Sequence, residues 1–282
     1  MNEIQIRKAL DILKPFNTIT NKHPIIEVRI IGNRTYSGYF RNIDNLIQAI
    51  KPYQDENIYI TLNEIDEACY SRDQNEKIIQ SSSRTKTTSD DNISARDYIL
   101  IDIDPKRASG VSASAEEVDK AKKVGREIYK YLKGQGFTEP ISAFSGNGFH
   151  LLYKVDLANT QENTELVKTF LQTLDMMFSD EFADVDATVY NAARITKLYG
   201  TASRKGASTE DRPHRESFII KAPDEIKTLD KAYIQKIANL YPKEEPKSWK
   251  NNYQNNRFNL DKFITDHGIS ILKRQKFKEG EK

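Results

Sequence analysis

The sequence has few of the residues that mark disulfide-bonded, cysteine-zinc and membrane-spanning proteins. A single cysteine, Cys69, among 282 residues excludes an internal disulfide and any zinc site built from cysteines of this chain. No apolar run approaches the ~18 residues that a membrane span requires, and residues 1–14 lack the apolar core of a signal peptide. These absences lead us to expect a soluble, cytoplasmic protein.

An excess of charge of one sign is also missing. The 43 basic and 41 acidic residues leave a net charge of only +2. Nucleic-acid binding is therefore not evident from overall composition, and any basic surface must come from local clustering. At 282 residues the chain can form one large domain or two small ones.

The N-terminal region is expected to fold as a small α/β unit. The pattern predicts helices over 3–14 and 44–50 and strands over 25–31, 35–40 and 57–62. Gly32 and Asn33 predict a hairpin turn between the first two strands, because both residues tolerate positive φ. We expect Asp44 to cap the second helix and Pro52 to stop it. The polar stretch 71–96 is a functional loop, a disordered segment or a plain connector.

The middle of the chain follows the order β-α-β-β-α-β. Strands are predicted over 98–104, 141–144, 149–155 and 195–199, with helices over 114–132 and 161–178. Ser114 and Glu117 form a capping box at the start of the first of these helices, and the acidic stretch Asp180–Asp186 is expected to be a turn. This is the ferredoxin-like or RRM-like order, so the predicted fold class is α+β with an RRM-like core.

We divide the chain into three parts. Residues 1–95 form the N-terminal α/β unit. Residues 96–241 form the RRM-like core, with a further strand over 216–220 and a last helix over 230–240. Residues 242–282 form a linker, indicated by Pro, Lys and Asn in 242–256, and the start of a helical segment over 261–268. This composition suggests that the chain is the N-terminal portion of a longer protein.

The strand over 98–104 ends in a pair of carboxylates. Side chains alternate along a strand, so Asp102 and Asp104 share one face and lie roughly 6 to 7 Å apart at the Cα. Burying both without a cation is costly, because like charges in a low-dielectric site repel. Carboxylate oxygens suit Mg²⁺ or Mn²⁺, and Mg²⁺ commonly shares its shell with waters and substrate phosphates. The pair is either a divalent metal site or a strand end that meets solvent.

A glycine-rich turn, Ser145-Gly-Asn-Gly-Phe-His150, joins the next two strands. Glycines let a backbone approach a ligand closely, and exposed amides with a hydroxyl can hold phosphate oxygens. We therefore consider Ser145, Asn147 and His150 as phosphate-binding residues; the alternative is a glycine-rich hairpin with a surface histidine. The turn lacks the Lys-Ser/Thr ending of a P-loop, so a Walker-type ATPase is not supported.

Acidic and basic residues follow the second core helix. Asp186, chosen over Asp184, would supply a third carboxylate, unless both belong to a solvated acidic turn. Six basic residues then gather in 194–215: Arg194, Lys197, Arg204, Lys205, Arg212 and Arg215. Arg194 and Lys197 are spaced to face a triphosphate, and the loop after them can follow a phosphate backbone. An ordinary exposed basic loop is the alternative.

The order of these motifs resembles the archaeo-eukaryotic primase superfamily, and within it the primase-polymerases of phages, plasmids and other mobile elements. The matching segments are LIDIDP, SGNGFH, DVDATVYNAARITKLYGT and RKGASTEDRPHR, within residues 30 to 220. That family shares an hhDhD strand, a small-x-His turn and a later hydrophobic-Asp. These motifs fall on Asp102 and Asp104, on Gly148–His150 preceded by Ser145, and on Val185-Asp186.

The resemblance implies an RRM-like catalytic core packed beside the N-terminal unit, in a protein of a bacterial, archaeal or phage-infected cell. Asp102, Asp104 and Asp186 would hold two Mg²⁺ or Mn²⁺ ions for template-directed nucleotidyl transfer. The residues implied in nucleotide binding are Ser145, Asn147, His150 and Arg194, with Lys197, Lys205 and Arg215 as weaker candidates. The implied partners are a single-stranded DNA template, a primer, dNTP or NTP, and a helicase domain further along a longer chain.

Two other classes of replication protein remain open. A nuclease of the HUH type also uses an RRM-like core, but it needs paired histidines, and no His-x-His occurs among His23, His150, His214 and His267. A non-catalytic module that binds single-stranded DNA would place aromatic residues on its sheet, where Asp102 and Asp104 would repel phosphate without a metal. The sequence leaves the choice of dNTP or NTP and the oligomeric state undetermined.

Overall fold

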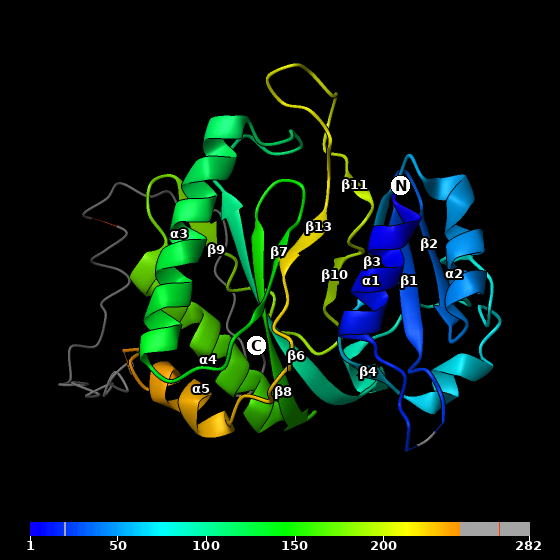
Figure 1. The fold of residues 1–282 in the computed structure, drawn as a ribbon, viewed down its shortest axis with the longest axis horizontal. Coiled ribbons are helices and arrows are strands. Elements are labelled where there is room, and N and C mark those ends of the chain that lie inside the picture. The colour runs from blue at the N-terminus through cyan, green and yellow to red at the C-terminus, as the bar shows by residue number, and fades with distance from the viewer. Residues whose placement is uncertain (20, 243–264, 266–282) are drawn as a thin grey trace. The chain divides into compact units, whose positions relative to one another are not determined.

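An N-terminal helical pair and a five-stranded sheet form the first part of the structure, a computed structural model that describes residues 1–19, 21–242 and 265. The sheet has the order β10-β3-β1-β2-β5. The elements are α1 (Glu3–Leu13), β1 (Ile26–Ile31), β2 (Thr35–Phe40), α2 (Ile43–Ile50), β3 (Asn57–Thr61), β5 (Ile79–Gln80) and β10 (Ile195–Lys197), with short 3₁₀ helices at Lys51–Tyr53, Glu67–Ser71 and Asp90–Asn92. Figure 1 shows them in blue and cyan, apart from β10.

Alternating burial along these strands explains how the sheet packs. Ile26, Val28 and Ile30 of β1 are at most 1% exposed and join the same hydrophobic core as Leu10 of α1 and Leu46 of α2. The intervening side chains of β1 belong to the opposite face of the sheet. That second face carries polar residues, and on β3 and β10 it contributes to the site described below.

The second sheet contains the RRM-like arrangement. Four of its strands lie in the order β9-β6-β8-β7, all antiparallel, and β13 and β4 extend it at the edges. The elements of this part are β4 (Glu64–Ile65), β6 (Ile93–Pro105), α3 (Ala115–Gly134), β7 (Ile141–Phe144), β8 (Phe149–Ala158), α4 (Gln161–Phe178), β9 (Ala183–Val185), β13 (Phe218–Lys221) and α5 (Lys231–Ala238). A separate two-stranded antiparallel sheet is formed by β11 (Ala202–Ser203) and β12 (Arg215–Glu216). The predicted α+β class and the β-α-β-β-α-β order are confirmed.

One strand of the predicted core was assigned wrongly. The strand that closes the RRM-like order is β9, which lies inside the acidic stretch that the sequence analysis took for a turn. Acidic residues are depleted in strands, but Ala183 and Val185 are buried and alternate with Asp184, as an edge strand requires. The strand predicted at 195–199 exists as β10, but it pairs with β3 in the first sheet.

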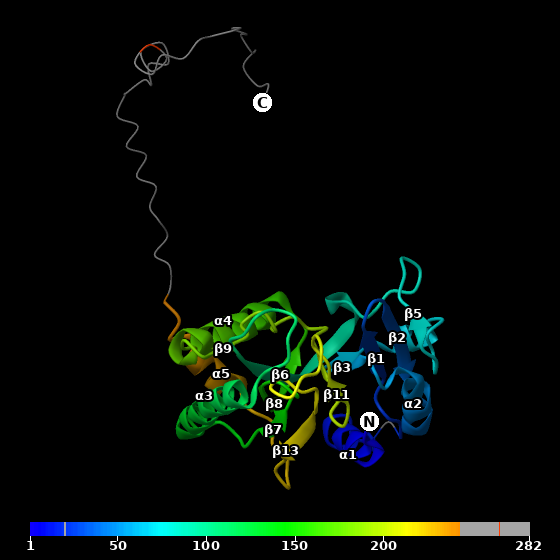
Figure 2. The ribbon, with the colours of Figure 1, turned by 90° about the horizontal axis from the view of Figure 1, so that it is seen from above.

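The two sheets exchange strands and share one core. β10, from late in the chain, completes the first sheet, and β4, from the early part, pairs with β6 of the second. Figure 2 shows the two sheets side by side, with β3 on the side of the first sheet that is nearer the second. Residues 1–242 form one compact unit. The boundary predicted between residues 95 and 96 stays a prediction, and the predicted linker and helix over 242–268 lie outside the described residues, apart from 242 and 265.

The hairpin between β1 and β2 and the helix α2 were predicted correctly, but the residues expected to cause the turn and to cap the helix were not. The hairpin between β1 and β2 is present, but its connection has neither Gly32 nor Asn33 at positive φ. α2 is capped by Asn42, not by Asp44. The capping box of Ser114 and Glu117 is present at α3. Of the helices in the described residues, none is long and apolar enough to cross a membrane.

A buried lysine ties α1 to the junction between the sheets. The Nζ of Lys14, whose residue is 2% exposed, donates to the carbonyl oxygens of Leu62 at 2.7 Å and Asn63 at 3.0 Å. Burial lowers the pKa of Lys14 to about 8. An unfolded lysine has a pKa of about 10.4, so between about 8 and 10.4 the unfolded state binds more protons than the folded state.

As the pH rises through this window, Lys14 is therefore expected to increase the free energy of unfolding by up to ~1.4 kcal/mol per pH unit. Below the window Lys14 is charged in both states, and the full cost of burying the charge lowers the stability of the folded state. Denaturant titrations at pH 8.0, 8.75 and 9.5 should show a smaller rise for Lys14→Met than for the wild type. Lys8→Met, an exposed lysine on the same helix, is the matched control. Equal slopes in wild type and Lys14→Met would contradict the assignment.

Candidate active site

A cavity of about 130 Å³ lies where residues of the two sheets face each other. The second sheet contributes residues of β6 and β8, and the first contributes residues of β3 and β10. Nine of the ten site residues predicted from sequence line it: Asp102, Asp104, Ser145, Asn147, His150, Asp186, Arg194, Lys197 and Lys205. The tenth, Arg215, does not. Residues spread over about a hundred positions of the chain are thus brought together by the strand order.

Two of the predicted carboxylates lie on β6, and the third directly follows the neighbouring strand β9. Asp102 and Asp104 project from the end of β6, with 22% and 39% of their side chains exposed. Ile103 pairs with Val185, and the Asp186 amide donates to the Asp102 carbonyl at 2.9 Å. Asp186 is therefore the cross-strand neighbour of Asp102, and opposite residues of an antiparallel pair face the same side at about 5.5 Å between Cα atoms.

The pKa values of the two carboxylates of β6 are shifted in opposite directions. Burial disfavours ionisation of Asp102, but His150 and the cations Lys205 and Arg194 outweigh burial, so the pKa of Asp102 lies below its ordinary value. Burial and then the charge of Asp102 raise the pKa of Asp104, more than Lys205 and Arg107 lower it. The strand thus holds one carboxylate that ionises readily and one whose charge is disfavoured.

One carboxylate oxygen is buried without a hydrogen-bond partner, as expected of a ligand to a divalent cation. Asp102 Oδ1 is buried and makes no hydrogen bond, although His150 Nε2 lies 3.3 Å from it. A bound cation would satisfy this oxygen and relieve the repulsion on Asp104. Asp186 is turned aside, because its Oδ1 accepts from the amide and hydroxyl of Thr188 at 2.8 and 2.6 Å. Accordingly, the described residues present no cluster of three or more acidic, His or Cys side chains ready to hold a metal.

A buried tyrosine contacts the ring nitrogen of His150 that lies farther from the carboxylates. His150 Nδ1 lies 2.7 Å from the hydroxyl of Tyr199, which is 1% exposed, and 3.4 Å from the hydroxyl of Thr196. Burial raises the pKa of Tyr199 well above its ordinary value, so the phenol keeps its proton and can donate to Nδ1. The Nε2 proton then faces Asp102 and the cavity.

The glycine-rich turn is built to lie against the carboxylate strand. Ser145 Oγ accepts from the Gly148 amide at 2.9 Å and closes the turn on itself. Gly148 has no room for a side chain, because an added Cβ would lie 2.3 Å from the Ile103 carbonyl oxygen and 2.6 Å from Asp104 Oδ1. Gly146 has φ of +99°, which favours glycine. The turn therefore fixes the distance between His150 and the carboxylates.

The side chain of Asn147 braces the turn. Its Oδ1 accepts from the Ala113 amide at 2.7 Å, and its Nδ2 donates to Ser203 Oγ at 2.8 Å. The residue is 2% exposed, and both the oxygen and the nitrogen of its amide already have a partner within the protein. Contact between this side chain and a nucleotide stays a prediction.

Three basic residues line the same cavity as the carboxylates. Arg194 follows the turn after Asp186 and donates to Asn191 Oδ1 at 2.9 Å and the Thr188 carbonyl at 3.0 Å. Lys205 Nζ lies 4.0 Å from Asp104 Oδ2. Lys197 Nζ donates to the Ala202 carbonyl at 2.7 Å, and burial, followed by the charge of Arg204, lowers its pKa to about 7. The cavity therefore brings acidic and basic side chains together, with Lys197 only partly charged near pH 7.

The rest of the basic loop is held by the protein itself. Arg212 makes a bidentate ion pair with Glu117 at 2.7 Å for each bond, and Arg204 pairs with Asp55 at 3.0 Å. Arg215 donates to the Ala113 carbonyl at 2.5 Å. These arginines therefore fasten the loop over 204–215 to α3 and to the first sheet, and contact between Arg215 and a nucleotide stays a prediction. The pairing of Arg212 with the capping box could not be read from local sequence.

The polar stretch 71–96 supports the turn that carries Arg194. Asp90 Oδ1 accepts from the Ala193 amide at 2.7 Å, and the buried Arg96 donates to the Tyr190 carbonyl at 2.7 Å. Asn63 joins the same turn to β6, donating to the Ala192 carbonyl at 2.8 Å and accepting from the Asp97 and Tyr98 amides. The stretch is thus an ordered connector whose end positions the site.

A second cavity of about 330 Å³ adjoins the first and shares Asp104 and Lys205 with it. Its other wall is the loop after β6, where Lys106 pairs with Asp184 at 3.0 Å. Asp184, passed over in favour of Asp186 in the sequence analysis, therefore lies beside the site but is neutralised by a lysine. The two cavities together offer a longer cleft than either alone.

Sequence reasoning missed Tyr59 and Tyr199. Tyr59 of β3 lines the cavity opposite the carboxylates, with Lys197 Nζ 5.1 Å from its ring centre. Burial and then the charges of Asp102 and Asp104 raise its pKa. Both tyrosines lie in strands of the first sheet or directly after one, and no local motif links that sheet to the carboxylates. Only the pairing of β10 with β3 brings them to the site.

Two solved structures resemble the chain at low sequence identity. No family model matches the sequence, and no curated protein does. Among solved structures, the AEP domain of the cyanophage S-2L primase-polymerase superposes with a TM-score of 0.46 at 14% identity, over 86% of this chain and 98% of that one. The primase RepB′ superposes with a TM-score of 0.43 at 13% identity, over 84% of this chain and 62% of that one. At this distance neither structure assigns residues or chemistry to the chain.

Proposed function

We propose that the chain is a DNA primase-polymerase that transfers nucleotides from dNTP or NTP to a 3′-hydroxyl on a single-stranded DNA template. The observation that carries the proposal is the division of charge in one cavity, with Asp102 and Asp104 on one wall and Arg194, Lys197 and Lys205 around them. A metal-bridged triphosphate has the complementary charge pattern. The motif order of the sequence, which resembles archaeo-eukaryotic primases, supports the same reaction independently of the geometry.

Asp102, Asp104 and Asp186 would hold the metals. Divalent ions bound there would lower the pKa of the attacking 3′-hydroxyl and stabilise the pyrophosphate leaving group. Asp102 already offers a buried oxygen without a hydrogen bond, and Asp186 joins it by turning its carboxylate away from Thr188. The raised pKa of Asp104 means that this carboxylate gains most from a nearby cation.

The cations and His150 would hold the triphosphate. Arg194 is oriented by two hydrogen bonds and presents its remaining donors to the cavity, and Lys205 stands where the two cavities join. His150, with Nδ1 occupied by Tyr199, has Nε2 left for a phosphate oxygen. Lys197 would bind phosphate in its charged form, so triphosphate binding near pH 8 would be accompanied by proton uptake on this lysine.

The biological setting follows from the resemblance. We place the activity in replication of a phage, plasmid or other mobile element, with a helicase domain in a longer form of the chain. The competing function is a non-catalytic module that binds single-stranded DNA. The carboxylates disfavour it, since they would repel phosphate at the deepest point of the cavity unless a metal reversed the local charge.

The test is a template-dependent extension assay. The protein is incubated with single-stranded DNA, labelled dNTP or NTP, and Mg²⁺ or Mn²⁺, with and without an annealed primer. We expect metal-dependent products whose length follows the template. Absence of product in every condition would overturn the proposal, and tight DNA binding without any product would favour the non-catalytic module.

A further inference from the structure

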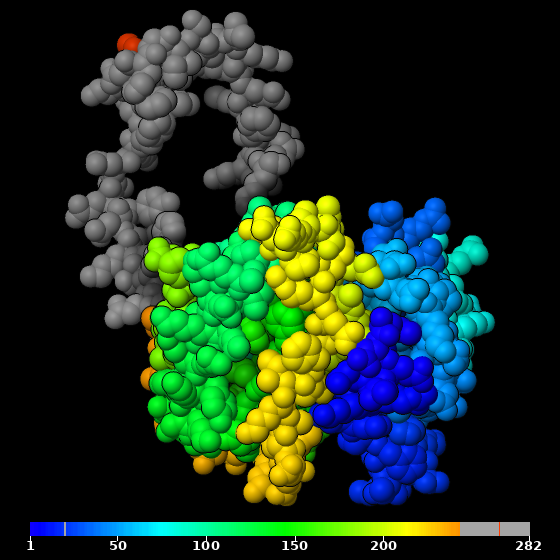
Figure 3. Space-filling view, turned by 45° about the horizontal axis from the view of Figure 1, so that its top comes forward, coloured from blue at the N-terminus to red at the C-terminus, as the bar shows by residue number. Residues whose placement is uncertain are grey.

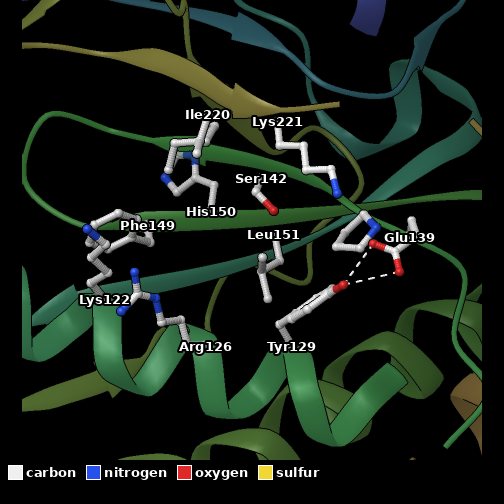
Figure 4. A pocket seen from close by; sticks show the side chains of 13 residues that line it. Lys122, Arg126, Tyr129, Glu139, Ser142, Phe149, His150, Leu151, Ile220 and Lys221 are labelled. Carbon is white, nitrogen blue, oxygen red and sulfur yellow. Dashed lines mark hydrogen bonds between the residues drawn. The ribbon is translucent and has the colours of Figure 1, made fainter. Parts of the chain in front are cut away.

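A third cavity, of about 280 Å³, opens on the opposite face of the second sheet. It lies between α3 and the edge strand β13, and its walls include Gly125 of α3, Ala143 of β7, Phe149 and Leu151 of β8, and Ile220 of β13. We call it the α3–β13 pocket (Figure 4). Phe149 and Leu151 flank His150 along β8, and alternation sends their side chains to the face away from the carboxylates.

The pocket continues into an exposed apolar strip. Phe218 and Ile220 of β13 are 41% and 50% exposed. The ring of Phe218 lies 5.5 Å from that of Phe144, which lies 5.4 Å from that of Phe149 in the pocket wall. Figure 3 shows β13, in yellow and orange, at the surface between α3 and α1. Contiguous apolar surface of this kind marks an interaction site.

Positive charge surrounds the pocket. Lys122 and Arg126 reach it from α3 and Lys221 from β13 (Figure 4). Within the part of the chain that the structure describes, these three side chains make no hydrogen bond or ion pair, although Lys221 interacts electrostatically with Glu139. Glu139 is the one carboxylate among the lining residues, and hydrogen bonds from Lys133 at 2.7 Å and from Tyr129 at 2.9 Å hold its pKa below the usual value.

We infer that the α3–β13 pocket binds a short acidic peptide segment of another protein, with one large apolar side chain in the pocket and flanking carboxylates on Lys122, Arg126 and Lys221. The apolar walls suit an aliphatic or aromatic side chain, and the unpaired cations complement carboxylates on both sides of it. Single-stranded nucleic acid fits less well, because its bases stack on a succession of aromatic faces, and Tyr129 and Phe149 are the only Phe, Tyr or Trp residues among the lining residues.

The inference goes beyond the proposed function and does not depend on it. The second sheet lies between the pocket and the carboxylate cavity, and His150 of β8 lines both. The three rim cations line the pocket alone, so none of them belongs to the candidate active site. Its occupant would attach the protein to a partner without blocking the cleft where template and nucleotide would bind.

Peptide selection on the full chain tests the inference. A display library of random dodecapeptides is panned on the immobilised protein, and a fluorescein-labelled consensus peptide is then titrated in solution. We expect the enriched peptides to carry an aromatic or large aliphatic residue beside Asp or Glu. The consensus peptide should bind at least tenfold more weakly to Lys122→Glu/Arg126→Glu and to Gly125→Leu.

The variants are matched to the geometry. A Cβ on Gly125 would make ordinary contacts, 3.8 Å to Phe149 Cβ and 3.9 Å to Ile103 Cδ1, so leucine there fills the pocket while favouring the helix. Lys123→Glu, on an exposed neighbouring position of α3, makes the same charge change away from the pocket and should bind as the wild type does. Melting temperatures confirm that each variant is folded.

Three outcomes would overturn the inference. The first is a selection that enriches no acidic-apolar motif. The second is equal affinity of the consensus peptide for wild type and folded Gly125→Leu. The third is an oligothymidine that competes with the peptide and loses binding in the same variants, which would make the pocket a nucleic-acid site.

Discussion

Asp104→Asn is expected to lose primer extension by roughly 10²–10³-fold or more, while its melting temperature stays the same or rises. A metal ligand contributes several kcal/mol to the transition state, and each 1.36 kcal/mol is tenfold in rate. The stability change has the opposite sign because the pKa of Asp104 is raised by burial and by Asp102. At pH 7 its ionised form therefore costs stability, and asparagine removes that cost.

Asp102→Asn provides the comparison within the site. It should lose extension to a similar degree, but its melting temperature should not rise, because the pKa of Asp102 is lowered and its ionised form is stabilised by the fold. Asp156→Asn, an exposed position on β8, is the control for the loss of one carboxylate. Full activity in either site variant would refute the assignment of the carboxylates, and a large fall in the melting temperature of Asp104→Asn would refute the electrostatic argument.

Gly148→Ala is expected to reduce extension by about 10²-fold through a change of one methyl group. The added Cβ would meet the Ile103 carbonyl and Asp104 Oδ1 well inside contact distance. The turn or the strand must therefore move, and displacements near 1 Å cost about that much in rate. Overpacking against backbone should also lower the free energy of unfolding by ~1–3 kcal/mol.

The control for this substitution is Gly134→Ala. Gly134 ends α3, and a Cβ there has nothing within 4 Å, so alanine should leave extension unchanged and stabilise slightly. The extension rate and the free energy of unfolding are measured for both variants. If Gly148→Ala extends a primer as the wild type does, the turn does not fix the carboxylates.

Local patterns were sufficient for much of the second sheet. The alternation along β6 predicted the shared face of Asp102 and Asp104, and the capping box of Ser114 and Glu117 predicted the start of α3. Gathering Ser145, His150, Asp186 and Arg194 in one site required the motif order, since no pairwise distance follows from spacing alone. Nine of the ten predicted residues line the cavity, although their chemical roles stay proposals.

Long-range pairing was outside the reach of sequence patterns. β10 has three residues and pairs with a strand more than a hundred positions earlier, so nothing local indicated which sheet would accept it. The same cause hid Tyr59 and Tyr199 from the site and concealed the ion pair between Arg212 and Glu117. In each case the deciding contact joins segments that only tertiary packing brings together.

The exchange of β10 has a consequence for synthesis of the protein. While the ribosome has not yet released residues 195–197, the outer edge of β3 has no partner, although β1 and β2 can already pair. An unpaired strand edge is a template for association with other chains. The first sheet of the nascent chain therefore stays incomplete, with the edge of β3 accessible to a chaperone. It is completed when the segment that carries Arg194 and Lys197 leaves the ribosome and β10 pairs with β3.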